Sequence, residues 1–151
     1  MRLGVALALT LVSCSPRPPA TLVWEGSGAP RAEAVTDAAA RLREASTGVR
    51  RGPWGDAEDA TLQLLETDRP EESHIHAQHD LTVVMLTGRG SVQIEERRYE
   101  LRAGDVLHIG RGKVHALFPQ GAVTGLAIFT PRLEGPDYVP ASMKNAPEND
   151  H

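Results

Sequence analysis

A series of short β-like segments starting at Ala60 is the strongest constraint on how this chain of 151 residues can fold. From there to Thr130, stretches such as LTVVML and AVTGLAIFTP are separated by glycine, aspartate or charged pairs. Short strands at this spacing predict an all-β barrel or sandwich. LTVVML is an unbroken apolar run that is rich in β-branched residues, which is typical of a strand buried on both faces. The alternation in SVQIEERRYEL predicts a half-exposed hairpin.

The residues on either side of this region predict helix, loop and tail. Residues 27–46 begin with a capping serine and a first-turn proline and carry one apolar stripe, which predicts a helix. Because that stripe is mostly alanine, we expect the helix to dock on a larger body. Residues 47–59 are rich in glycine, proline and charge and predict a loop. We therefore predict a helical and loop extension at residues 21–59, a barrel at 60–130 and an irregular tail at 131–151.

The first residues have the composition of an export signal. One arginine precedes an apolar run that ends at Val12 and is too short to cross a bilayer. The stretch LVSC, ending at Cys14, resembles a bacterial lipobox; the alternative is an ordinary signal peptide. The lipobox implies a lipoprotein signal peptide at residues 1–13, lipidation of Cys14 and a tether at 14–20. We therefore expect an envelope protein, anchored by lipid on the periplasmic face of the outer membrane.

The charge composition limits the classes of partner that the protein is expected to bind. The chain has 16 Lys and Arg against 20 Asp and Glu, a net charge of −4, and no basic cluster. This composition gives no support for nucleic-acid binding. The predicted partners are a small-molecule ligand or substrate, the membrane through the N-terminal lipid only, and, as one option, a second copy of the chain in a homodimer.

Histidines gather just before the apolar strand, in the stretch ESHIHAQHD. Residues two apart on a strand project to the same face, so His74 and His76 are predicted to point together into the barrel. His115 follows the glycine-rich stretch GDVLHIGRGKV on a later strand. Three converging imidazoles form a site for one divalent transition-metal ion, and Fe, Mn, Zn, Ni, Co and Cu all remain candidates.

These stretches resemble the two motifs of the cupins, in particular the small single-domain bacterial cupins of the cupin 2 type. In the first motif, two histidines separated by one residue precede a glutamate and a strand-ending glycine; His74, His76 and Gly88 match. In the second, a Gly-Asp start leads to a Pro-x-Gly turn and to a histidine three residues after its glycine; Gly112 and His115 match, whereas Gly110 replaces the usual proline. The resemblance implies an all-β cupin jelly-roll, or double-stranded β-helix, barrel that holds a metal through the three histidines.

The glutamate of the first cupin motif is missing. The commonest spacing before the motif glycine places Leu81 there, and the shorter spacing after His76 places Asp80. Strand parity puts His79 on the same face as Leu81, so we rank His79 first and Asp80 second as the fourth ligand. A site of three histidines alone is the remaining alternative.

Two further polar side chains have weaker assignments. His108, on the VLHIG strand, is a candidate to support the metal ligands or to face a substrate; its alternative is an exterior strand position. Glu71 is expected to be a solvated charge at the rim of the barrel.

The sequence leaves three interpretations of function open. The leading one is a metal-binding cupin lipoprotein, either a metal-dependent dioxygenase or an isomerase acting on a small molecule. The second is a non-catalytic module that holds a small ligand or the metal alone. The third is a degenerate cupin without metal. A cupin fold by itself does not choose among them.

Overall fold

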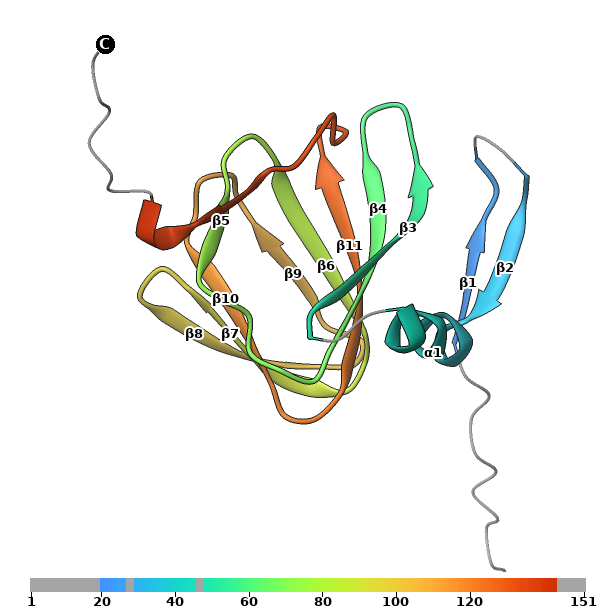
Figure 1. The fold of residues 1–151 in the computed structure, drawn as a ribbon, viewed down its shortest axis with the longest axis horizontal. Helices are drawn as coiled ribbons and strands as arrows, with labels where there is room; N and C mark the ends of the chain where they lie inside the picture. Colours follow the sequence, from blue (N-terminus) through green and yellow to red (C-terminus); the bar gives the residue numbers. More distant parts are fainter. Residues whose placement is uncertain (1–19, 27–28, 46–47, 144–151) are drawn as a thin grey trace, which may run out of the picture.

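Two antiparallel five-stranded sheets face each other and form a barrel (Figure 1). The structure is a computed structural model and describes residues 20–26, 29–45 and 48–143. The first sheet has the order β12 (Tyr138–Pro140), β5 (His74–His76), β10 (His115–Pro119), β7 (Arg89–Ile94) and β8 (Arg97–Arg102). The second has the order β3 (Arg50–Asp56), β4 (Thr61–Thr67), β11 (Val123–Thr130), β6 (Asp80–Thr87) and β9 (Val106–Ile109). This architecture confirms the predicted jelly-roll barrel.

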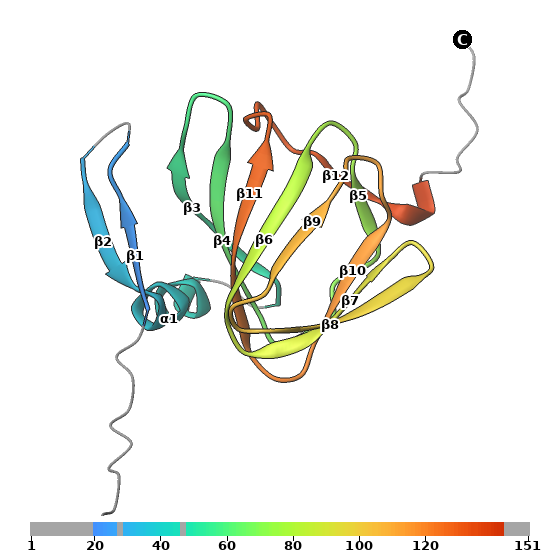
Figure 2. The same ribbon diagram turned by 180° about the vertical axis from the view of Figure 1, so that it is seen from behind.

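A small N-terminal unit lies outside the barrel, beside β3 and β4 (Figure 2). It consists of the hairpin β1 (Thr21–Trp24) and β2 (Arg31–Ala34), followed by α1 (Val35–Ala45). At the other end of the described chain, a 3₁₀ turn (Ala141–Met143) follows β12. None of the helices within the described ranges is long and apolar enough to span a bilayer.

The barrel interior is filled by apolar side chains from alternate strand positions. On β6, Leu81, Val83 and Met85 are buried in the interior, which confirms the predicted parity of this strand. Their neighbours in this core come from β7, β8, β9, β10 and β11. The buried members of the core are Leu81, Val83, Met85, Val92, Leu101, Ile109, Leu117, Val123, Ala127 and Phe129.

A second core lies between α1 and the outer face of the β3–β4 sheet. Ala38 and Leu42 of the helix pack against Trp54 and Leu64 of the sheet. The prediction that the alanine-rich helix face docks on a larger body is therefore confirmed. In the same layer, the buried Glu66 forms ion pairs with Arg50 and Arg43, so its carboxylate is compensated.

The flanking segments contain more strand than the sequence predicted. The helix begins at Val35, not near residue 27, because residues 31–34 pair with β1. The predicted loop at 47–59 contains β3, which pairs with β4 and shifts register between Pro53 and Gly55. Since β3 is an edge strand, its proline and glycines are tolerated there. Likewise, the predicted irregular tail contains β12, which pairs with β5.

The predicted signal peptide at residues 1–13, the lipidation site Cys14 and nearly all of the tether lie outside the described residues. The lipoprotein prediction therefore still depends on the sequence pattern alone.

Gly88, the glycine of the first motif, offers a direct test of the packing where β6 ends. Its φ is +79°, and an added Cβ would lie 2.4 Å from the Ala122 carbonyl oxygen. Gly121 also has a positive φ, but a Cβ there would meet open space. We expect Gly121→Ala to lower the free energy of unfolding by about 1–2 kcal/mol through backbone strain alone. Gly88→Ala should lower it clearly further, as measured by denaturant unfolding; equal effects would contradict this packing.

Candidate metal centre

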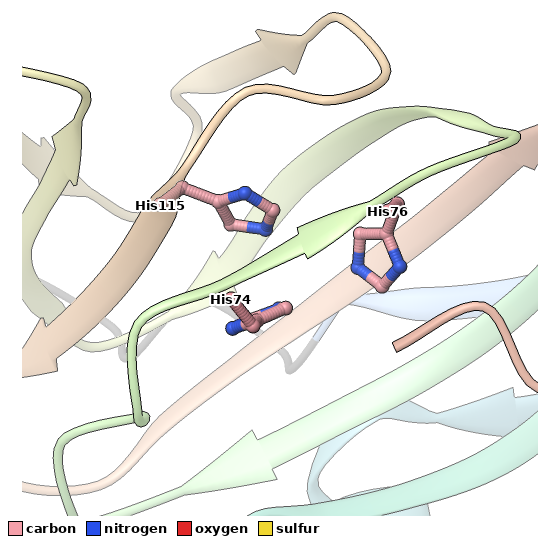
Figure 3. A group of neighbouring side chains, drawn as sticks. All are labelled: His74, His76 and His115. Atoms are coloured by element: carbon pink, nitrogen blue, oxygen red, sulfur yellow. The ribbon is translucent and has the colours of Figure 1, made fainter. Parts of the chain in front are cut away.

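Three buried histidines point toward one another inside the barrel, His74 and His76 from β5 and His115 from β10 (Figure 3). One ligand nitrogen from each lies within 4.8 Å of the others. The ring centroids of His74 and His115 are 4.3 Å apart, because these residues are partners in the antiparallel β5–β10 pair. The structure thus brings together the three histidines that the sequence predicted as metal ligands. We call them the histidine triad.

Backbone carbonyls orient two rings of the histidine triad. Nδ1 of His74 donates to the Glu72 carbonyl at 2.8 Å, and Nδ1 of His115 donates to the Lys113 carbonyl at 2.9 Å. Because a carbonyl oxygen can only accept, Nδ1 carries the proton and Nε2 keeps its lone pair. His115 Nε2 is buried and, within the described part of the chain, has no hydrogen-bond partner. An orphaned acceptor held in this tautomer fits a transition-metal ion.

A glycine turn fixes His115 relative to β5. The N–H of Gly112 donates to the His76 carbonyl at 2.7 Å. Its φ of +73° is favourable for glycine and allows the chain to turn into β10. The turn of the second motif is thereby tied to the strand of the first.

The electrostatic environment keeps the triad neutral. Burial is the main cause that lowers the pKa of His74, His76 and His115. For His76 the pKa falls to about 4, with further lowering by the two neighbouring histidines. Neutral imidazoles can coordinate a metal without first losing a proton.

The triad opens onto an inner cavity with largely apolar walls. Its polar lining consists of the triad, Arg51, Gln63 and Glu71. The space open to the centres of water molecules is about 50 Å³, which is room for several waters. A wider, open vestibule adjoins it, and four residues line both: Arg51, Gln63, His76 and Phe129. We call these four residues the throat.

His79, ranked first as a fourth ligand, is engaged elsewhere. Its Nδ1 lies 2.5 Å from Asp137 Oδ2, and its Nε2 lies 3.3 Å from the Arg132 carbonyl. Asp137 also accepts the N–H groups of Ala77 and Gln78, so it fastens the chain before β12 to the loop after β5. The parity argument did not apply to His79 because β6 begins only at the next residue.

Asp80, the second choice, faces the outside of the barrel. It accepts the Arg111 N–H at 2.8 Å and pairs with the Arg111 guanidinium at 3.3 Å. Leu81, at the place of the family's glutamate, faces the inner cavity. Among the described residues, the triad is the only group of three or more His, Cys, Asp or Glu residues placed to hold a metal. This arrangement matches the remaining alternative from the sequence, a site of three histidines alone.

The two weaker assignments are both corrected. His108 is exposed on the outer side of β9, where its Nδ1 lies 3.0 Å from the Thr82 hydroxyl, so it neither supports the triad nor faces the cavity. Glu71 is not at the solvated rim: its side chain is only 9% exposed and pairs with Arg51 at 3.1 Å. Burial raises its pKa. The Glu71 N–H donates to the Leu117 carbonyl, which draws this coil residue against β10.

Arg51 and Tyr138 are site residues that the sequence reasoning missed. Arg51 comes from the predicted loop, and Tyr138 comes from the predicted tail. The Tyr138 ring stacks on His74 with centroids 4.3 Å apart and an interplanar angle of 23°. Neither residue lies in a motif, and only the pairing of β3 and β12 with the barrel sheets brings them here.

Residues 61–129 match the family model of the cupin domain, and this segment contains the whole histidine triad. A protein of Aquifex aeolicus (strain VF5), described as uncharacterized, is 39% identical over 70 residues. That alignment covers 46% of this chain and 58% of the relative, so the likeness spans little more than half of the relative's length.

Solved structures share the barrel. KdgF from Halomonas sp. superposes with a TM-score of 0.55 and 21% identity, over 59% of this chain and 85% of that chain. A variant of Streptomyces Pac13 with bound uridine gives a TM-score of 0.56 and 14% identity, over 64% of this chain and 80% of that chain. At this identity the likeness shows the fold alone, and it agrees with the predicted cupin architecture.

The lowered pKa values predict acid sensitivity of the metal-free protein. With a folded-state pKa of about 4 for His76 against an ordinary 6.5, the unfolded state binds more protons between these values. The free energy of unfolding, measured in the presence of a chelator, should therefore fall as the pH drops from about 6.5 to about 4. His76→Gln should flatten this dependence. An equally steep profile in His76→Gln would contradict the burial of a neutral imidazole.

Proposed function

We propose that this chain, which carries a cupin domain at residues 61–129, binds one divalent transition-metal ion through the histidine triad and uses it on a small molecule. The observation that carries the proposal is the buried Nε2 of His115, which lacks a hydrogen-bond partner among the described residues and belongs to a group of three converging ligand nitrogens. Because buried polar atoms in native proteins almost always have a hydrogen-bond partner, such an atom indicates a missing ligand.

The geometry favours an open metal site over a closed storage site. A closed tetrahedral site needs a fourth protein ligand. The two residues suggested by the sequence for this role are bound to Asp137 and Arg111 instead. With three protein ligands, coordination positions remain for water or substrate, and the throat leads from them to the vestibule.

Such a site suits catalysis on a small molecule. A metal ion with open positions supplies Lewis-acid polarisation or, if it is redox-active, binding of dioxygen, which correspond to an isomerase and a dioxygenase. The chain's own contribution is to hold the ligand nitrogens in one tautomer and to surround them with apolar walls that limit water. Enzymes occur on this fold: Pac13 is described as a nucleoside dehydratase. This supports small-molecule chemistry as a class and does not name the reaction.

Metal analysis of the untagged chain tests the proposal. We expect about one divalent ion per chain and a rise in stability of about 2.7 kcal/mol at a hundredfold excess of metal over its Kd, seen as a shift of several degrees in Tm. His115→Ala should abolish stoichiometric binding. His108→Ala is the matched control on the outer face. His79→Ala should keep one ion per chain, because both ring nitrogens are engaged away from the triad.

A metal-free chain whose Tm ignores added Zn²⁺, Mn²⁺, Fe²⁺, Co²⁺, Ni²⁺ and Cu²⁺ would overturn the proposal and favour the degenerate cupin. Loss of binding in His79→Ala with retention in His115→Ala would place the ion elsewhere.

The place of action that we propose is the cell envelope, with the chain held by lipid on Cys14 at the periplasmic face of the outer membrane. The support is the lipobox-like stretch LVSC in the sequence. Lipid attachment needs the thiol, so Cys14→Ser should release the protein from the membrane fraction or block its processing. The measurement is membrane partitioning together with the mass of the mature chain. Unchanged partitioning and mass would remove the lipoprotein assignment.

A further inference from the structure

Arg51 is the one charged residue of the throat at neutral pH, since the other three members are Gln63, Phe129 and the neutral His76. Because Arg51 lines both the inner cavity and the vestibule, its side chain can contact a ligand in either of them. The Arg51 side chain is 41% exposed, so it is accessible from the vestibule while it also lines the inner cavity.

Neighbours on two sides hold Arg51 in this place. Its Nη2 lies 3.1 Å from Glu71 Oε1, and its Cζ lies 5.8 Å from the centroid of the Tyr138 ring. Tyr138 in turn stacks on His74 of the triad. The guanidinium is therefore held by the Glu71 carboxylate, and the Tyr138 ring lies between it and His74 of the triad.

The charges of the inner cavity favour an anionic ligand. The charges of Arg51 and Glu71 compensate each other in an ion pair, and imidazoles that coordinate a metal ion are neutral ligands. A divalent ion on the triad would leave two positive charges uncompensated in a cavity with mostly apolar walls. Buried charge without a counter-charge is costly, so an anion that reaches the ion gains more than a neutral molecule.

Arg51 also has the chemistry for one kind of anion. A guanidinium presents several N–H donors in a planar fork that matches the two oxygens of a carboxylate. One ion pair with Glu71 does not use all of these donors. Gln63, beside it in the throat, offers an amide that can donate to the same ligand. The inner cavity is small, with about 50 Å³ open to the centres of water molecules, which limits the buried part of the ligand to a few heavy atoms.

We propose that Arg51 binds the carboxylate of a short hydroxy or oxo acid. The hydroxyl or oxo oxygen of the same molecule would then reach the metal ion of the histidine triad. This inference rests on the proposed function, because the second contact needs the ion. Glu71 is a positioning residue that holds the guanidinium at the throat.

The probes for the test are glycolate and its neutral amide, glycolamide, which share the hydroxyl and differ in charge. The full chain is loaded with Co²⁺, whose visible bands report on its coordination. Binding is followed by these bands and by calorimetry. The variants are Arg51→Gln, Arg51→Lys and the double variant Arg51→Gln with Glu71→Gln, which removes both charges and leaves no buried carboxylate unpaired. Arg111→Gln is the matched control, since Arg111 also pairs with a carboxylate but lies outside the barrel.

We expect glycolate to perturb the Co²⁺ bands and to bind the unmodified chain at least about tenfold more tightly than glycolamide. In chains saturated with Co²⁺, Arg51→Gln and the double variant should weaken glycolate binding about tenfold or more and change glycolamide binding much less. Arg51→Lys should restore part of the affinity, and Arg111→Gln should behave as the unmodified chain.

Three outcomes overturn the inference alone: Co²⁺ is bound but glycolate is not, the two probes bind equally, or both Arg51→Gln and the double variant bind glycolate as well as the unmodified chain does. If no Co²⁺ bands appear even without a probe, the proposed function fails first, and the role of Arg51 fails with it.

Discussion

The alternation of side chains along antiparallel strands is the constraint on which the metal centre depends. On β5, His74 and His76 face the cavity while Ile75, between them, does not line it. On β3, Arg50 turns to the outer layer and pairs with Glu66, whereas Arg51 lines the throat. A shift of one residue in the pairing of β5 would replace two ligands by one isoleucine. The pairing of β5 with β10 and β12 therefore decides which side chains of β5 face the cavity.

The orientation of the ligands depends mainly on the backbone. In both His74 and His115, Nδ1 donates to the carbonyl two residues earlier in the chain. Such a bond needs no particular side chain at the accepting residue, so it survives substitution there. A second set of contacts acts through Asp137, which joins His79 and two backbone N–H groups near β5. This connection places Tyr138, the next residue, on the ring of His74.

The sequence predicted the barrel and the triad because both depend on local patterns. Strand periodicity and the spacing of His74, His76 and His115 are visible along the chain, and the parity of β6 followed from the same rule. His79 and Asp80, the predicted fourth ligands, lie apart from the triad for a local reason: parity holds only inside a strand, and β6 begins at Asp80, whose side chain points outward.

Other features could not be predicted because they arise from contacts between distant segments. Glu71 lies in coil, and a hydrogen bond to β10 and an ion pair with β3 bring it into the barrel. The segment that contains β3 has the glycine and proline content of a loop, yet it becomes an edge strand through pairing with β4. No periodicity in one chain reports such pairings, so Arg51 and Tyr138 had no signal in the sequence.

The pairing of β3 and β12 with the barrel has a consequence for how such a protein can change over evolutionary time. The triad lies within residues 61–129, whereas Arg51 precedes that segment and Tyr138 follows it. The three candidate ligands thus lie in one central stretch of the chain, while two of the residues around them come from its flanks. Replacing either flank would leave the tautomers of His74 and His115 set by their own backbone and would alter what reaches them. If the proposed function holds, a lineage could change the surroundings of the metal ion by substituting residues in the flanks while it keeps the three histidines.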